Sequence, residues 1–326
     1  MRNYFFKYAV LINISFNFST HYQILNMRKF TLFLLLLAIG YSSKAQQLHF
    51  LSQYLQHNSM LNPAAAGMSD KSFVGVSYRN QWASFPGNPR TYMVYGDVNL
   101  AKLKAGIAGY VYRDETGPIS RTGVQFAYSY HIIGRDEKQK FAIGIELRGL
   151  QYAIDKNKLL AALGNDAVLG GATSKFGLDA GVGVYYTNSK LNVGAAVSQM
   201  IQSKLQLASV PSSKLTGRLY RHYNLIANYE IKSGGDITLI PNALVRVIEN
   251  APTEFEAGIK LDYQKLFWTA IVYKMRQSYS LQVGLKVADK LNLSYSYDVY
   301  NAPISIFDGG SGAHEIGLRF DFGKSK

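Results

Sequence analysis

The stretch LNLSYSYD, residues 291–298, alternates strictly between two kinds of side chain. Leucine and tyrosine occupy the odd-numbered positions, and asparagine, serine and aspartate occupy the even-numbered ones. Because successive residues of a β-strand point to opposite faces of a sheet, such a segment has one apolar face and one polar face. The stretch therefore predicts a strand that separates an apolar environment from a wet one.

The same period of two recurs through most of the chain. Clear examples are FAIGIELR (141–148), LQVGLKV (281–287) and HEIGLRFDF (314–322). We count fourteen such runs, which begin near residues 72, 91, 104, 121, 140, 176, 190, 219, 236, 253, 266, 279, 290 and 313. Most span about 9–12 residues, the length of a tilted strand that crosses a membrane, and the number is even, as in single-chain bacterial barrels.

The connections between the runs alternate in length. Short turns such as TNSK (187–190), KSGGD (232–236) and ADK (288–290) join every second pair of runs, and the other connections include long ones near 150–175, 200–218 and 299–312. Short periplasmic turns and longer surface loops are typical of outer-membrane barrels, whereas nothing in a soluble β-sandwich requires short and long connections to alternate. The sequence thus predicts an all-β fold, a transmembrane antiparallel outer-membrane β-barrel of about 14 strands.

The N-terminal region predicts export. Met27, Arg28 and Lys29 precede the apolar run FTLFLLLLAIG (30–40), and Ser43-Lys44-Ala45 forms a small-x-small cleavage site. This run is shorter than the roughly 20 residues of a membrane-spanning helix, which argues against a retained anchor. We expect residues 1–26 to lie upstream of the true start at Met27, and residues 27–45 to be a signal peptide. Residues 46–70 then form a segment in the periplasm or the barrel lumen, and residues 71–326 form the barrel.

Processing between Ala45 and Gln46 is directly testable. Mass spectrometry of the protein from outer membranes should find an N-terminal peptide that begins at Gln46, because signal peptidase cleaves after small residues of this pattern. A peptide that retains Met1 would contradict both the start site and the signal peptide.

Composition excludes several classes of protein. The chain has 326 residues and no cysteine, so disulfides, thiolate metal sites and a lipoprotein anchor are excluded. Residues 1–45 carry five basic side chains and no acidic one, so the 35 basic and 21 acidic residues of the chain leave 30 against 21, or +9, after cleavage. This surplus is scattered and contains no block of five or more, so we predict no nucleic-acid partner.

No pattern in the sequence indicates an enzyme or a cofactor. None of the six histidines pairs with another at the spacing of a metal site on a helix, and Leu318 stands where a zinc motif begun by His314-Glu315 needs a second histidine. Carboxylates such as Glu146, Asp179 and Glu256 lie on the polar faces of predicted strands. We interpret them as lumenal charges that are balanced by basic residues such as Arg148 and Lys260.

Two segments carry short motifs in a fixed order. The first is NPAAAG (62–67), which follows Ser52-Gln53-Tyr54, and the second is YRNQWASFPGNPRTY (78–92). On the predicted topology the second segment is the first surface hairpin, in which Arg79 and Gln81 point into the lumen. We expect Arg79 to point towards acids such as Asp97 or Glu315. Trp82 falls where an interfacial indole is favoured. The chain ends in GGSGAHEIGLRFDF (309–322), whose last strand finishes near an aromatic residue.

Together these motifs resemble the PorP/SprF family of type IX secretion membrane proteins from Bacteroidota; the extra Gly312-Ala313 is a small departure from its closing segment. The residues that carry the resemblance, and that we take as candidate structural or partner-contacting positions, are Asn62, Pro63, Gly67, Arg79, Gln81, Trp82, Gly87, Pro89, Thr91, His314 and Glu315.

The resemblance implies an outer-membrane barrel that acts in the secretion or surface anchoring of cargo with C-terminal sorting domains, and of gliding adhesins in motile species. Its partners would be outer-membrane lipid, the cargo and periplasmic components of the secretion system. Two alternatives stay open from the residues alone. One is a passive porin or a channel for hydrophobic substrates with an N-terminal plug, and the weaker one is a surface enzyme in a barrel.

Overall fold

The structure is a computed structural model. It describes residues 51–69, 71–135, 138–158, 174–204, 218–233, 235–288, 290–303, 305–306 and 309–323. The predicted start at Met27, the signal peptide and the Ala45–Gln46 cleavage site lie outside the described residues.

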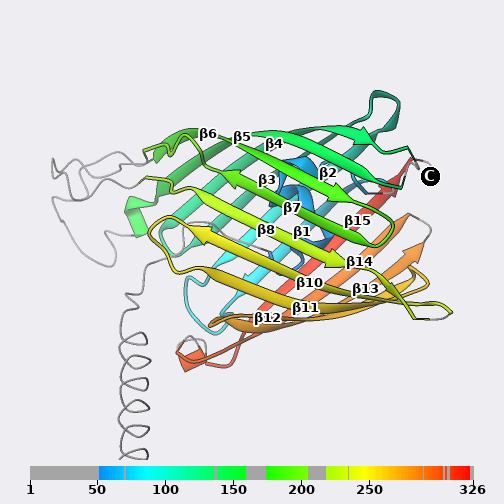
Figure 1. The fold of residues 1–326 in the computed structure, drawn as a ribbon. Helices are drawn as coiled ribbons and strands as arrows, with labels where there is room; N and C mark the ends of the chain where they lie inside the picture. The colour runs from blue at the N-terminus through cyan, green and yellow to red at the C-terminus, as the bar shows by residue number, and fades with distance from the viewer. Residues whose placement is uncertain are drawn as a thin grey trace, which may run out of the picture. The chain divides into compact units, whose positions relative to one another are not determined.

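The alternating runs form the strands of one antiparallel sheet (Figure 1). The strands are β1 (Ser72–Gln81), β2 (Arg90–Leu100), β3 (Ala105–Thr116), β4 (Ile119–Ile133), β5 (Lys140–Ile154), β6 (Ser174–Thr187), β7 (Leu191–Ser198), β8 (His222–Tyr229), β9 (Ile231–Lys232), β10 (Ile237–Ile248), β11 (Glu254–Tyr263), β12 (Phe267–Lys274), β13 (Ser278–Ala288), β14 (Leu291–Tyr300) and β15 (Ala313–Phe322). Both β8 and β9 pair with β10, so they are two parts of one strand interrupted at Glu230. The described residues therefore contain the fourteen predicted strands, and each begins within three residues of the expected position.

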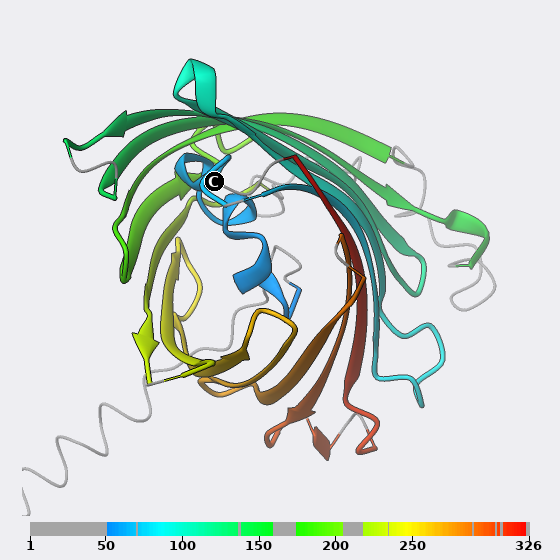
Figure 2. The same ribbon diagram turned by 90° about the vertical axis from the view of Figure 1, so that its right-hand side faces the viewer.

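The sheet closes on itself. The first strand pairs with the last along its whole length, from Ser72 opposite Phe322 to Gln81 opposite Ala313. The ring continues through the pairing of β10 with β11, so every strand has a neighbour on each side (Figure 2). Closure satisfies the backbone groups that an open sheet would expose to lipid. The predicted barrel is confirmed.

The two ends of the barrel differ in their connections. Turns of two to six residues join β2 to β3, β4 to β5, β6 to β7, β9 to β10, β11 to β12 and β13 to β14. The longest connections, residues 155–173, 199–221 and 301–312, all lie at the opposite end. We call these the short-turn end and the long-loop end; in outer-membrane barrels they face the periplasm and the cell surface. Among the described residues no helix is long and apolar enough to cross a membrane.

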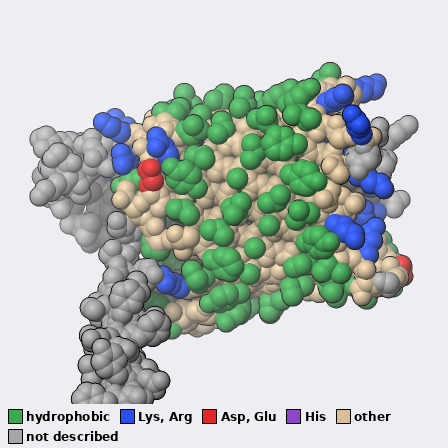
Figure 3. Space-filling model, in the orientation of Figure 1, with side chains coloured by type: hydrophobic (Ala, Val, Ile, Leu, Met, Phe, Trp, Pro, Cys, Tyr) green, Lys and Arg blue, Asp and Glu red, His purple; other side chains and the backbone are tan. Residues whose placement is uncertain are grey.

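The outer surface is an apolar band. On β1, Val74 and Val76 are almost half exposed, whereas Ser77 and Arg79 are buried on the inner face. Figure 3 shows apolar side chains covering the middle of the barrel wall, with Lys and Arg side chains gathered towards the two ends. This arrangement fits a wall that faces hydrocarbon in the middle and headgroups at its edges.

A charge in the middle of this band should impair insertion. Val283, near the centre of β13, and Val287, near its end, both point outward. We expect Val283→Arg to cost about 2–4 kcal/mol and Val287→Arg only about 0–1 kcal/mol, because the penalty falls with distance from the membrane midplane. Unfolding in lipid bilayers measures both values. Equal costs would contradict the assigned depth of β13.

The N-terminal segment lies inside the barrel. Residues 51–69, which we call the plug, contain three short 3-10 helices: η1 (Tyr54–Gln56), η2 (Asn58–Met60) and η3 (Pro63–Ala65). Figure 2 shows the plug in the lumen, surrounded by the strands. Leu51, Leu61 and Ala64 are at most 2% exposed. Of the two placements expected from the sequence, the lumenal one is therefore correct for the described part of this segment.

Candidate functional site

The NPAAAG segment of the plug rests against the inner wall of β3–β7. Asn62 caps the N-terminus of the 3-10 helix η3, because its side-chain oxygen accepts a hydrogen bond from the Ala64 backbone amide at 2.9 Å. Its side-chain amide donates to the Val184 carbonyl of β6 at 2.9 Å. Pro63 follows as the first residue of η3, where its missing N–H is not needed. One side chain thus forms the local turn and attaches it to the wall.

Small residues allow this close approach. A Cβ atom at Gly144 of β5 would lie 2.3 Å from the Ala64 nitrogen, and one at Gly183 of β6 would lie 2.1 Å from the Asn62 Oδ1 atom. On β3, a Cβ atom at Gly106 would lie 2.1 Å from the Ala66 carbonyl oxygen. The plug backbone therefore fits only because these wall positions lack side chains.

Gly67 ends the segment in a conformation that other residues rarely adopt. Its φ is +70°, and a Cβ atom there would lie 2.4 Å from the Gly106 Cα atom. Its amide donates to the Asp97 carboxylate of β2 at 2.8 Å. Gly67 thus serves both as a turn and as a site of backbone contact with the wall.

The wall also supplies partners for the carbonyl groups of the plug. Because the plug is buried and irregular, its backbone groups need hydrogen bonds from elsewhere. The donors are Arg148 to Met60 at 3.0 Å, Asn224 to Leu61 at 2.9 Å and Ser129 to Ala64 at 3.0 Å, and the His131 ring lies 2.9 Å from the Ala66 oxygen. The polar inner face of the barrel therefore replaces water around the plug.

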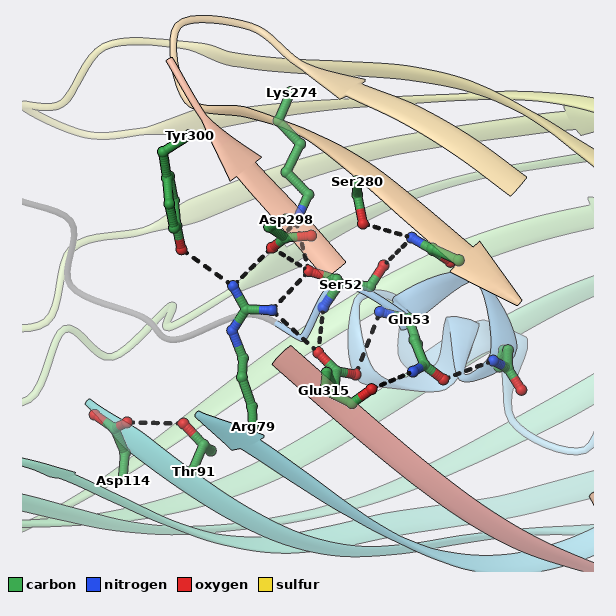
Figure 4. A network of polar contacts seen from close by, with 12 residues as sticks. Ser52, Gln53, Arg79, Thr91, Asp114, Lys274, Ser280, Asp298, Tyr300 and Glu315 are labelled. Carbon is green, nitrogen blue, oxygen red and sulfur yellow. Dashed lines mark hydrogen bonds and ion pairs between the residues drawn. The ribbon is translucent and has the colours of Figure 1, made fainter. Parts of the chain in front are cut away.

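The other end of the plug is held by a buried charged cluster, the Ser52 network (Ser52, Arg79, Lys274, Asp298 and Glu315; Figure 4). The Ser52 amide donates to Glu315 at 2.7 Å, and its hydroxyl donates to Asp298 at 2.5 Å. Arg79 and Lys274 both donate to the Ser52 hydroxyl oxygen at 2.8 Å. Four strands thus converge on one plug residue.

Arg79 is the central cation of this network. Its guanidinium lies 2.7 Å from Asp298 and 3.3 Å from Glu315, and all three side chains are almost fully buried. It also donates to the Tyr300 hydroxyl at 3.3 Å. The expected contact with Glu315 is present, but the suggested contact with Asp97 is not, because Asp97 lies near the short-turn end and binds Gly67.

The plug therefore connects two opposite parts of the wall. Its Ser52 end contacts β1, β12, β14 and β15, and its NPAAAG end contacts β3–β7 and, through Gly67, β2. In the ring of strands these two groups lie roughly half a turn apart. Gln53 and Gln282 strengthen the first contact, since Gln53 donates to the Glu315 carbonyl at 3.3 Å and Gln282 to the Ser52 carbonyl at 2.8 Å.

The first surface hairpin is fixed to its neighbours. The backbone amide of Gln81 donates to the Pro89 carbonyl at 3.0 Å, which closes the hairpin. The backbone amide of Gly117 donates to the Gly87 carbonyl at 2.8 Å. Gly87 has a φ of +74°, which favours glycine. Thr91, at the start of β2, donates to the Asp114 carboxylate of β3 at 2.9 Å (Figure 4).

Trp82 and His314 lie at the same end of the barrel. Trp82 has a φ of +55°, its amide donates to the Gly312 carbonyl at 2.8 Å, and its ring centroid lies 5.9 Å from that of Tyr300. The indole is thus packed at the junction of the first hairpin and the last loop. His314 lies next to two outward-facing tyrosines, with its Nδ1 atom 2.7 Å from the Tyr295 hydroxyl and its ring 4.9 Å from that of Tyr297.

The lumenal acids are held by structural contacts. Glu146 pairs with Arg148 at 2.8 Å, as the sequence suggested, whereas Lys260 pairs with Asp262 at 3.4 Å. Asp179 accepts hydrogen bonds from the backbone amides of Ala180 and Ile201. Within the described ranges, no group of three or more His, Asp or Glu side chains is placed to hold a metal ion.

Ser52, Lys274 and Asp298 are site residues that the sequence patterns did not predict. Asp298 and Lys274 lie at the inward positions of β14 and β12 near the long-loop end, so alternation indicates their direction but not their depth. Ser52 stands in the Ser52-Gln53-Tyr54 motif, which was the available signal.

Comparison with solved structures gives distant similarities. The CymD monoaromatic hydrocarbon channel is 10% identical, with 87% of this chain and 96% of that chain covered and a TM-score of 0.49. The P. putida toluene transporter TodX is 10% identical over 81% and 93% of the two chains, with a TM-score of 0.45. A Pseudomonas aeruginosa FadL homologue is 11% identical over 80% and 93%, with a TM-score of 0.46. No curated protein matches the chain significantly.

Family comparison gives a clear assignment. The family described as type IX secretion system membrane protein PorP/SprF matches residues 43–320, a range that includes the plug, the first hairpin and most of β15. The motif residues lie in the plug, in and beside the first hairpin and at the start of the closing strand β15. This chain is therefore an outer-membrane β-barrel that belongs to the PorP/SprF family of type IX secretion system membrane proteins.

Proposed function

We propose that this barrel acts without enzymatic chemistry in the secretion or surface anchoring of cargo proteins that carry C-terminal sorting domains, including gliding adhesins in motile species. Its further partners are periplasmic components of the same system, and it reaches the membrane through a signal peptide cleaved after Ala45. The observation that carries the proposal, beyond family membership, is that the protein's own N-terminal segment occupies the lumen.

A lumen that contains an attached plug favours anchoring over passive transport. The plug is buried, and hydrogen bonds attach it to opposite sides of the wall. A solute that crossed the barrel would have to pass this attached segment. The alternative, a porin or a channel for hydrophobic substrates, therefore requires a path past the plug.

The long-loop end offers a firm surface for cargo. The first hairpin is joined to the last loop through Trp82 and Gly312, and to the β3–β4 turn through Gly87 and Gly117. Phe85 at its tip is 58% exposed. A rigid surface with an exposed aromatic side chain loses little conformational entropy when a partner binds.

Two measurements on one preparation test the proposal. The purified barrel should capture a sorting-domain cargo in a pull-down and show no steady conductance in planar bilayers. Steady conductance without capture would instead support the channel alternative. Capture by a detergent-solubilised barrel of unrelated family under the same conditions serves as the control for non-specific binding.

Phe85→Asp should weaken cargo capture at least tenfold while the amount of folded barrel stays normal, because a charge replaces an exposed apolar contact. Leu266→Asp is the matched control, since Leu266 is also exposed and lies in the β11–β12 turn at the short-turn end. Heat-modifiable migration in gels reports folding of both variants. Equal capture by the two variants would argue against a docking role for the first hairpin.

A further inference from the structure

Basic side chains gather on one side of the short-turn end. We count each turn with one flanking residue on either side. The turns β2–β3, β4–β5 and β6–β7 then carry Lys102, Lys104, Arg135, Lys138, Lys140 and Lys190 against Asp136 and Glu137. Six cations and two anions give these three neighbouring turns a net charge of +4. The other three short turns carry Lys232, Lys265 and Lys290 against Asp236 and Asp289, a net charge of +1.

The first of these basic turns has a fixed position. It contains the 3-10 helix η4 (Ala101–Leu103), which ends at Lys104 with a φ of +49°. The Lys104 carbonyl accepts a hydrogen bond from the His131 amide of β4 at 2.7 Å. Lys102 and Lys104 are thereby held beside the β4–β5 turn, and both side chains are exposed.

An apolar surface borders these cations. Tyr130 and Ile132 at the end of β4, and Phe141 at the start of β5, are exposed on the outer face of the wall. They form the edge of the apolar band at the short-turn end, only a few residues along the chain from Lys138. In an outer-membrane barrel this edge lies at the level of the lipid headgroups of the periplasmic leaflet.

We propose that Lys102 and Lys104 of the β2–β3 turn, with Arg135 and Lys138 of the neighbouring β4–β5 turn, bind the headgroups of anionic phospholipids in the periplasmic leaflet, whose acyl chains lie against Tyr130, Ile132 and Phe141. Each lysine near a membrane surface attracts anionic lipid. The apolar side chain of Leu103, 69% exposed between Lys102 and Lys104, favours lipid over an acidic protein surface, because it gains by entering the acyl region.

Native mass spectrometry of the full barrel in mild detergent tests this site. The protein is delipidated and then titrated with phosphatidylglycerol or, separately, with phosphatidylcholine. The wild type should bind phosphatidylglycerol more tightly. The affinity for phosphatidylglycerol should fall on the order of 100-fold in the triple variant Lys102→Gln/Lys104→Gln/Lys138→Gln, which is about fivefold for each lysine removed. The matched control is Lys232→Gln/Lys265→Gln/Lys290→Gln on the other side of the rim, which should change it less than threefold.

The site would be overturned by equal binding of the two lipids or by equal losses in the two triple variants. Heat-modifiable migration ensures that only folded protein is compared. Polyglutamate serves as a probe for the competing partner: tight binding of polyglutamate to the wild type, lost in the first triple variant and without a preference for phosphatidylglycerol, would assign these turns to an acidic protein instead.

Discussion

Arg79→Ala is expected to destabilise the folded barrel by about 3–5 kcal/mol, because it leaves buried carboxylates without their main cation. Asp298 and Glu315 are each 1% exposed, so water cannot replace the guanidinium. Lys274 remains 3.2 Å from Asp298, but Glu315 loses its only ion pair among the described residues. Denaturant unfolding of the barrel in detergent or bilayers measures the loss.

Two controls separate this effect from a general loss of charge. Arg79→Lys keeps the charge but cannot contact Asp298, Glu315 and Tyr300 with one planar group, so it should recover only part of the stability. Arg113→Ala removes an exposed ion pair with Glu115 and should cost at most about 1 kcal/mol. A loss of stability from Arg79→Ala no greater than that from Arg113→Ala would show that the Ser52 network does not stabilise the barrel.

The second large effect is expected from added methyl groups on the inner wall. The Gly144→Ala/Gly183→Ala variant places two Cβ atoms at 2.3 and 2.1 Å from plug atoms. Each overlap should cost about 1–3 kcal/mol, so the pair should cost about 2–6 kcal/mol or force the plug from its site. Unfolding measures the first outcome, and planar-bilayer conductance detects the second as an opened lumen.

Gly96→Ala is the matched control for this variant. A Cβ atom at Gly96 would meet its nearest neighbour, the Phe73 carbonyl oxygen, at an ordinary 3.4 Å. This substitution should therefore leave both stability and conductance close to the wild-type values. If Gly144→Ala/Gly183→Ala behaves in the same way, the plug does not rest on the wall as described.

Alternation predicted the strands well because it reports a strong physical constraint. A strand between hydrocarbon and a polar lumen must present each side to one of them, so segments such as 281–287 and 314–322 show the period of two clearly. The plug has no such constraint. It is irregular, and its buried backbone is satisfied by distant wall residues such as Ser129 and Asn224, which no local pattern connects to it.

Alternation also could not predict how far along the barrel axis an inward-facing side chain lies. Asp97 and Glu315 both lie at inward positions on neighbours of β1, so either was a reasonable partner for Arg79. The register decides between them, because Arg79 lies directly opposite Glu315, whereas Asp97 lies opposite Phe73 near the other end of the strand. Register depends on the pairing of whole strands, so a single run of residues does not contain it.

The position of the Ser52 network has a consequence for the order of folding. Ser52 is close to the N-terminus of the described chain, but its partner Glu315 lies 263 positions later, on the last strand. That carboxylate lies opposite Arg79 only when β15 pairs with β1 and the barrel closes. The Ser52 end of the plug, which is synthesised before any strand, therefore has its full set of partners only in the closed barrel.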